Sequence, residues 1–186
     1  MEEKIFYFQK EEDNTEKALQ LALDTAKRFD IKSVILASTS GNTAIQAAKM
    51  FKGSNINLFI VGHQYGMREP GKTRFTKENI EMVEKIGFKV HFGTDLLTAT
   101  VGAFREKFGS GPFGIIADTL RMFCQGIKVA TEVAIMACDA GLVSSEEDVV
   151  AVAGTGKGAN TVIVLQPENT YRIFQTKIKR IIAKEI

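Results

Sequence analysis

Two glycine-rich segments carry hydroxyl and amide groups at a spacing that could bind an anion. The first is Thr39-Ser40-Gly41-Asn42-Thr43, which ends an apolar run and precedes an alanine-rich helical pattern. The first amides of a helix lack an intrahelical acceptor and the helix dipole adds partial positive charge, so this junction suits a phosphate or carboxylate. Glycine allows close approach of the backbone, and the side chains can add hydrogen bonds. A well-capped helix after a strand explains the same residues equally well.

The second segment lies between two apolar strand patterns near the carboxyl end of the chain. Its candidate ligand-binding residues are Gly154, Thr155, Gly156, Lys157, Gly158 and Asn160. They offer free amides and a cation to a phosphate. The segment is not a Walker P-loop, because its lysine is followed by glycine and the chain continues into a strand pattern rather than a helix. A flexible hairpin between antiparallel strands is the alternative interpretation.

A third candidate wall follows another strand pattern and contains His63 and Gln64. Histidine can carry protons at neutral pH, so His63 is a weak catalytic candidate. A polar loop residue is the simpler interpretation. His91 falls within a strand pattern, which favours a structural role.

A polar stripe crosses an otherwise apolar helical pattern. Its members are three or four residues apart and therefore share one face: Arg121, Gln125, Lys128 and Glu132. The stripe could face a ligand or another subunit, or it could contain an internal Lys128–Glu132 pair. The sequence shows no pattern typical of a catalytic triad, a paired-carboxylate cleft or a metal-ligand cluster, so no metal is expected.

Strand and helix patterns alternate along the chain, and this predicts a three-layer α/β/α fold with a mostly parallel central sheet and partly antiparallel C-terminal strands. Continuous apolar runs such as VILA and LFIV indicate strands that are covered on both faces. Strands are predicted at 4–9, 34–37, 58–61, 88–92, 148–153 and 161–165, and helices from 15 onward and at 44–50, 77–86, 96–108 and 115–140.

The predicted helix 115–140 is apolar around most of its circumference, so we expect it to be largely buried, partly by a second copy of the chain in a homo-oligomer. Cys124 and Cys138 both fall in this pattern. They would be separated by roughly 21 Å of helix rise, which is too far for a disulfide bond. Both are predicted to be buried thiols.

Length and composition indicate one α/β domain spanning residues 1–186. The chain is 45% hydrophobic and carries a net charge of +2. No apolar stretch reaches the roughly 18 to 20 residues of a membrane helix, and the acidic start is unlike a signal peptide, so a cytoplasmic location is expected. The basic run 177–180 is short and interrupted by isoleucine. A solvated face explains it better than nucleic-acid binding.

The chain resembles stand-alone relatives of the pyruvate kinase C-terminal domain, small archaeal and bacterial proteins usually labelled pyruvate kinase α/β domain. Three motifs carry the resemblance, which covers nearly the full length: STSGNTA (38–44), IADTLRMFCQGIKVATEVAIMACDAGL (116–142) and VVAVAGTGKGANTVIVLQP (149–167). The long middle motif is the specific one. In pyruvate kinase a similar loop binds a phosphate of the sugar bisphosphate activator, so the resemblance implies phosphate binding at Thr39 to Thr43.

The resemblance further implies that the protein binds flavin mononucleotide (FMN), as stand-alone members of the family look able to do, and it leaves open a flavin-dependent oxidoreductase. Pyruvate kinase activity is not expected, because the catalytic barrel has no counterpart here. The segment TATVGAFR (98–105) departs from the Ser/Arg-rich segment expected at that point. The alternative function is a regulatory or assembly module that senses a phosphometabolite and self-associates through the helix at 115–140.

The string TSGNT also looks like the substrate-carboxylate loop of pyridoxal-phosphate enzymes of the cysteine synthase kind. Those enzymes need a Schiff-base lysine and a second domain. No lysine here stands in a matching upstream context, and the chain is short for two domains. A fragment of such an enzyme is therefore the least favoured interpretation.

Overall fold

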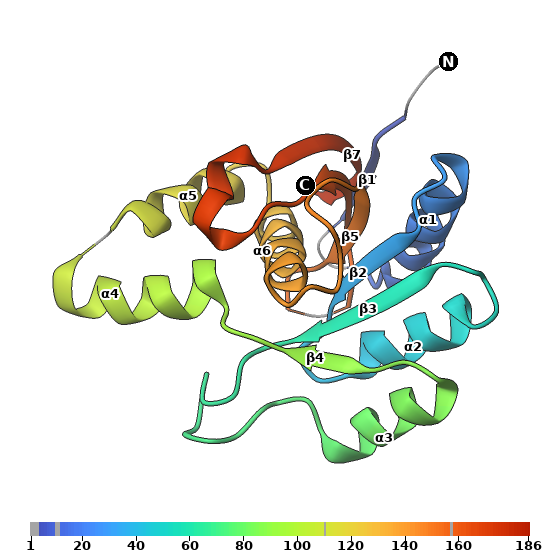
Figure 1. The fold of residues 1–186 in the computed structure, drawn as a ribbon, viewed down its shortest axis with the longest axis horizontal. Coiled ribbons are helices and arrows are strands. Elements are labelled where there is room, and N and C mark those ends of the chain that lie inside the picture. Colours follow the sequence, from blue (N-terminus) through green and yellow to red (C-terminus); the bar gives the residue numbers. More distant parts are fainter. Residues whose placement is uncertain (1–3, 10–11, 110, 157) are drawn as a thin grey trace.

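The computed structural model describes residues 4–9, 12–109, 111–156 and 158–186. In these residues the chain forms a seven-stranded sheet with helices on both faces, as the alternating pattern predicts (Figure 1). The strand order is β1-β7-β6-β5-β2-β3-β4. The strands are β1 (Phe6–Phe8), β2 (Ser33–Ala37), β3 (Asn57–Gly62), β4 (Val90–Phe92), β5 (Val149–Ala153), β6 (Thr161–Gln166) and β7 (Lys177–Glu185).

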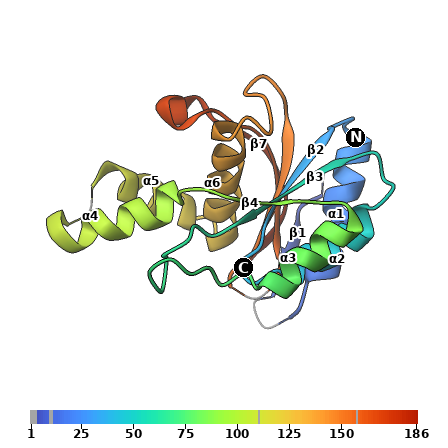
Figure 2. The same ribbon diagram turned by 60° about the horizontal axis from the view of Figure 1, so that its bottom comes forward.

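Helices α1 (Thr15–Arg28), α2 (Asn42–Phe51) and α3 (Lys77–Ile86) cover one face of the sheet, and α6 (Gln125–Asp139) covers the other (Figure 2). Neighbouring residues of one strand point to opposite faces, so they enter different cores. Val34 and Leu36 join the α1–α2–α3 core, whereas Ile35 joins the α6 core. Two buried faces explain why the strands are continuously apolar.

The topology places a switch point at the carboxyl ends of β2 and β5. Strand β2 pairs in parallel with both β3 and β5, while β5–β6 and β6–β7 are antiparallel. The chain leaves β2 through α2 on one face and enters β5 from α6 on the other. In open α/β sheets, ligands bind in the crevice that forms at such a point.

The predicted helix 115–140 is two helices, α5 (Pro112–Arg121) and α6, separated at residues 122–124. Cys124 is extended, with φ 179° and ψ 165°, and its Sγ accepts a hydrogen bond from the Ile127 amide at 3.4 Å. The apolar pattern runs through the break without glycine or proline, so the sequence gives no stop signal there. Both cysteines are free; Cys138 is buried, but Cys124 is only half-buried.

Helix α6 is largely covered within its own chain. Most of its residues are buried, and it packs on β5, β2 and β6. The π-helix η1 (Leu96–Thr100) continues into α4 (Val101–Phe108), and α4 and α5 together form an arm that leaves the body of the molecule (Figure 1). The predicted helix 96–108 is therefore present, but its first part, 96–100, is a π-helix.

The remaining element is the 3-10 helix η2 (Thr170–Gln175), which precedes β7. The basic run 177–180 belongs to β7, and residues 177–179 there are exposed, as expected for a solvated face. Within the described residues, no helix has both the length and the apolar character needed to cross a membrane.

Candidate functional site

A cavity of about 610 Å³ opens at the carboxyl ends of β2, β3 and β5. Its walls come from the loop after β2, the loop after β3, the hairpin between β5 and β6, and one face of α6. The start of α1 and the segment after β4 close the remaining sides. All three segments selected from the sequence therefore contribute to one cavity.

The amino terminus of α2 forms one wall. Thr39, Ser40, Asn42 and Thr43 line the cavity. Among the described residues, no side chain caps this helix by a hydrogen bond. The first amides of α2 and the positive end of its dipole are thus available to an anion in the cavity.

Gly41 does not line the cavity but lets the loop pack against α3. Its φ is +101°, and a Cβ there would lie 2.6 Å from Phe75 Cε1 and 2.6 Å from Asn79 Cβ. Asn79 Nδ2 donates to Ser40 O at 2.9 Å and to Asn42 Oδ1 at 3.3 Å. The glycine is required for this contact behind the loop, because any side chain would collide with α3.

The β5–β6 segment is a hairpin between antiparallel strands, as its alternative interpretation predicts. Gly154, Gly156 and Gly158 line the cavity. A Cβ on Gly154 would lie 2.1 Å from Gly158 O, so the hairpin closes only with glycine there. Lys157 lies outside the described residues.

Two predicted residues of this hairpin bind the C-terminal strand instead of lining the cavity. Thr155 Oγ1 donates to Glu185 Oε2 at 2.5 Å, and Asn160 Nδ2 donates to Thr155 Oγ1 at 3.0 Å. The Ala159 amide donates to Thr15 Oγ1 at 3.1 Å. These bonds fix the hairpin between β7 and the start of α1.

His63 lines the cavity and forms a pair that the sequence does not reveal. Its Nδ1 lies 2.9 Å from Asp95 Oδ2. The buried Asp95 carboxylate also accepts from the Gln64 amide at 3.3 Å, and the Asp95 amide donates to Gln64 Oε1 at 3.2 Å. Gln64 therefore holds Asp95 in place and does not line the main cavity. Thirty-two positions separate histidine from aspartate, so no local pattern links them.

The α6 wall presents polar and apolar groups side by side. Gln125, Val129, Glu132 and Val133 line the cavity. Glu132 accepts from the Leu97 amide at 2.6 Å and from Thr98 Oγ1 at 2.8 Å. The wall thereby holds the segment after β4 against α6.

The predicted Lys128–Glu132 pair is present, with Lys128 Nζ 2.5 Å from Glu132 Oε2. Lys128 is fully buried, and this burial lowers the pKa of its ammonium group, while Glu132 acts in the opposite direction. Arg121 Nε donates to Gln125 Oε1 at 2.8 Å, so the polar stripe is internally bonded across the helix break.

Sequence reasoning missed several residues of the cavity. They come from segments with no motif of their own and are Asp13, Thr15, Gln46, Asp95 and Thr98. Met67 and Arg68, which follow His63 and Gln64 in the third candidate wall, also line the cavity, whereas the missed residues depend on how distant segments pack. Among the described residues, no group of His, Cys, Asp or Glu is suited to a metal ion.

Fold and cavity together define an α/β protein whose main described cavity lies at the switch point of a mostly parallel sheet. The family model described as pyruvate kinase, alpha/beta domain matches residues 16–165, which is most of the chain. The protein therefore belongs to this family.

Solved structures show more distant similarity. The chain is 17% identical to a pyruvate kinase from Cryptosporidium parvum, with a TM-score of 0.41. The match covers 82% of this chain and 22% of that one. For Cryptosporidium parvum pyruvate kinase in complex with ADP, the TM-score is 0.38 at 17% identity, and the match covers 80% of this chain and 22% of that one. For an O-ureido-L-serine synthase, the TM-score is 0.33 at 15% identity, and the match covers 67% of this chain and 47% of that one. The chain thus spans about a fifth of the pyruvate kinases it matches.

Proposed function

We propose that this protein binds a phosphorylated small molecule, preferably FMN, with the phosphate at the amino terminus of α2. The observation that carries the proposal is the uncapped start of α2 on a cavity wall. The cavity volume of about 610 Å³ supports it, since ligand pockets measure roughly 300 to 1,000 Å³.

The chemistry of the lining residues supports FMN as the ligand. Phosphate oxygens would accept hydrogen bonds from the first α2 amides and from the hydroxyls of Ser40 and Thr43. The flavin ring would lie against the apolar group formed by Val61, Val129 and Val133. When bound, FMN would supply hydride or single-electron transfer, while the chain supplies anchoring and a partly apolar environment. We expect no pyruvate kinase activity from this domain by itself.

The test is a charge introduced at the proposed phosphate site. Asn42 is exposed, and Asn42→Asp keeps the oxygen that accepts from Asn79. The new carboxylate should preserve or slightly raise stability through the helix dipole, yet repel phosphate. FMN affinity, measured by quenching of flavin fluorescence, should fall at least about tenfold, equivalent to 1.4 kcal/mol.

Asn57→Asp is the matched control, because it makes the same change on an exposed residue at the opposite end of β3. It should leave FMN affinity unchanged. Riboflavin, which lacks the phosphate, should bind the wild-type protein more weakly than FMN and should not distinguish the two variants. Equal binding of riboflavin and FMN would contradict the phosphate site, and no binding of either would contradict the flavin.

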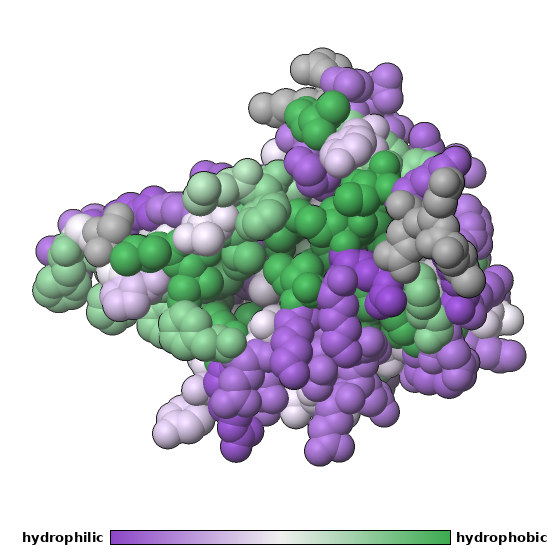
Figure 3. Space-filling view, turned by 90° about the horizontal axis from the view of Figure 1, so that it is seen from above, coloured by the Kyte–Doolittle hydropathy of each residue, from purple (hydrophilic) through white to green (hydrophobic). Residues whose placement is uncertain are grey.

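A second candidate function is a phosphometabolite-sensing assembly module, and the arm favours it. Hydrophobic side chains gather along the arm and continue onto the body (Figure 3). The exposed ones on the arm and next to it are Phe104, Phe108, Phe113, Ile115, Met122 and Phe123. A large apolar surface of this kind commonly marks an association site, and we propose a second copy of the chain as its partner.

The third alternative, a pyridoxal-phosphate enzyme fragment, would need a lysine in the cavity for a Schiff base. In the part of the chain that the structure describes, no lysine lines the cavity, and the buried Lys128 is paired with Glu132. No observation favours this alternative over FMN binding.

A further inference from the structure

We propose that His63 is the proton-transfer residue of the cavity and that Asp95 is its positioning residue. The nature of the substrate, a phosphorylated molecule anchored at α2, rests on the proposed function, whereas the pairing and orientation of His63 do not. The inference extends the protein from a binding module to an enzyme that moves protons on its ligand.

The first step is the orientation of the imidazole. Asp95 Oδ2 lies 2.9 Å from His63 Nδ1, and a carboxylate can only accept a hydrogen bond. Nδ1 must therefore carry a proton. In the neutral ring, Nε2 then keeps a free lone pair, the form in which histidine acts as a base. His63 lines the cavity with its side chain about one-third exposed, so its ring can be reached by a ligand there.

The second step is the fixed position of Asp95. Its side chain is 4% exposed and held by the Gln64 amide. Its backbone oxygen accepts from the Ala99 amide at 2.8 Å and from the Thr98 amide at 3.2 Å, at the start of η1. Asp95 is thus held at its carboxylate by the loop after β3 and at its backbone by η1. Burying a carboxylate costs free energy. A histidine that was only a solvated loop residue would not need such a buried partner.

The third step is the chemistry. Nε2 would remove a proton from an O–H, an N–H, or a C–H next to a carbonyl of the ligand, and the electron pair would stay on the ligand as an anion. The imidazolium formed would lie against the Asp95 carboxylate, which stabilises its positive charge. Return of the same proton to another ligand atom completes the reaction. No electron is transferred, so no oxidant or reductant is needed.

The experiment uses the small number of histidines. The chain contains two, so His91→Gln leaves His63 as the single imidazole. His91 lies on β4 with its ring against Phe59, outside the cavity lining. In this background, nitrogen NMR of histidine-labelled protein in alkaline buffer should show the Nδ1–H tautomer of His63. An Nε2–H tautomer in the otherwise unaltered protein would overturn the proposal.

A second readout reports the reactivity of Nε2, which a purely structural hydrogen bond would not change. Diethyl pyrocarbonate acylates an unprotonated imidazole nitrogen, and mass spectrometry locates the product. His63 should react several-fold faster than in Asp95→Ala, whose fold is checked by circular dichroism. An equal rate in a folded Asp95→Ala variant would contradict the positioning role.

Protection by ligand separates this inference from the proposed function. If FMN binds, saturating FMN should slow acylation of His63 several-fold; an unchanged rate with FMN bound would show that His63 does not reach the ligand and would overturn the proposal. If FMN does not bind, the proposed function fails, while the tautomer and its dependence on Asp95 still decide the role of His63.

Discussion

At the residue scale, the segment between β4 and α4 supplies partners to two walls of the cavity. Asp95 bonds to His63, and Leu97 and Thr98 bond to Glu132. These bonds connect the loop after β3 with α6. Disturbing one buried partner should therefore affect stability as well as the shape of the cavity.

Lys128→Met tests the cost of breaking the buried pair. The substitution removes the ammonium group that faces Glu132 and leaves that carboxylate without its countercharge. Removing one partner of a buried pair typically costs about 3 to 5 kcal/mol of unfolding free energy. Urea unfolding should show this loss. Lys49→Met, on the exposed face of α2, is the control and should change stability by less than about 0.5 kcal/mol.

The pH dependence of the wild-type protein provides a separate prediction. The pKa of Lys128 is lowered by burial from its ordinary value of 10.5, so in the alkaline range below 10.5 the unfolded chain binds the proton more tightly than the folded chain. The contribution of Lys128 to the free energy of unfolding should therefore rise with pH in that range. Urea unfolding at several alkaline pH values should show a smaller rise in Lys128→Met, and an identical slope in both proteins would contradict the lowered pKa.

At the scale of elements, the start of α6 depends on close contact with β6. Gly126 lies in the first turn of α6, and a Cβ there would lie 1.9 Å from Thr161 Oγ1 and 2.5 Å from Thr161 Cβ. Thr161 is fully buried in β6 and cannot move aside easily. Helix propensity and packing therefore make opposite predictions for alanine at this position.

We expect packing to dominate, so Gly126→Ala should destabilise the protein by about 1 to 3 kcal/mol. Gly102→Ala is the matched control in α4, where nothing lies within 4 Å of the added Cβ. Relief of the glycine cost should make that variant more stable by about 0.5 to 1 kcal/mol. Urea midpoints measure both. A gain of stability in Gly126→Ala would show that α6 and β6 are less closely packed than described.

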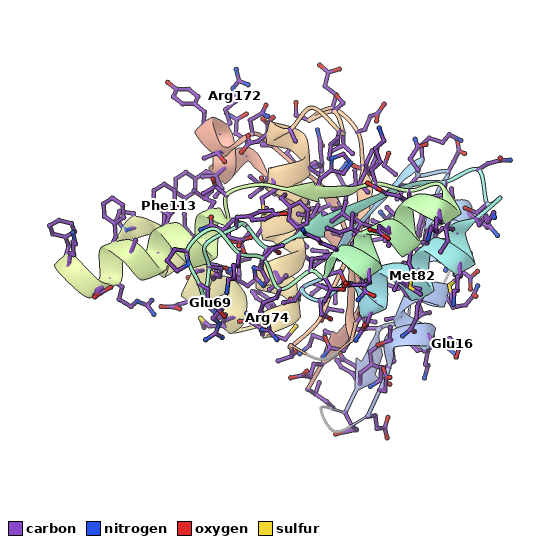
Figure 4. The ribbon with its side chains drawn as sticks, turned by 90° about the horizontal axis from the view of Figure 1, so that it is seen from below. Glu16, Glu69, Arg74, Met82, Phe113 and Arg172 are labelled. Carbon is purple, nitrogen blue, oxygen red and sulfur yellow. The ribbon has the colours of Figure 1, made fainter. Side chains whose placement is uncertain are left out.

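At the scale of the whole molecule, the arm is the feature that most affects association. A self-association surface there would bury residues that are now exposed. Met122 is 83% exposed beside the arm, and Met82 on α3 is 52% exposed. Figure 4 shows Met82 on the body, well separated from Phe113 on the arm.

Met122→Glu should therefore lower the molar mass measured by light scattering, because a carboxylate buried in an apolar interface loses its hydration. Met82→Glu carries the same change away from the arm and should leave the mass unaltered. A mass that changes equally in both variants, or in neither, would contradict an interface on the arm. If the protein also senses its ligand, saturating FMN should shift the mass of the wild-type protein.

The class of fold and the position of the loops that line the cavity could be predicted from the sequence, because the signals are local. Continuous apolar strands such as 34–37 follow from burial on both faces, and glycine-rich segments at strand ends mark the edge where loops meet. The antiparallel hairpin after β5 follows equally from local turn chemistry. Each of these features depends on residues that are neighbours along the chain.

The pairing of His63 with Asp95, the break before α6 and the exposure of the arm were decided only in three dimensions. The first joins residues thirty-two positions apart, the second falls at 122–124 where no glycine or proline marks it, and the third depends on which helix covers the sheet. An apolar pattern indicates that a helix is buried, but it does not indicate which element covers it. The sequence by itself therefore determined most of the elements and the edge of the sheet where the cavity lies, and tertiary packing decided which side chains meet there.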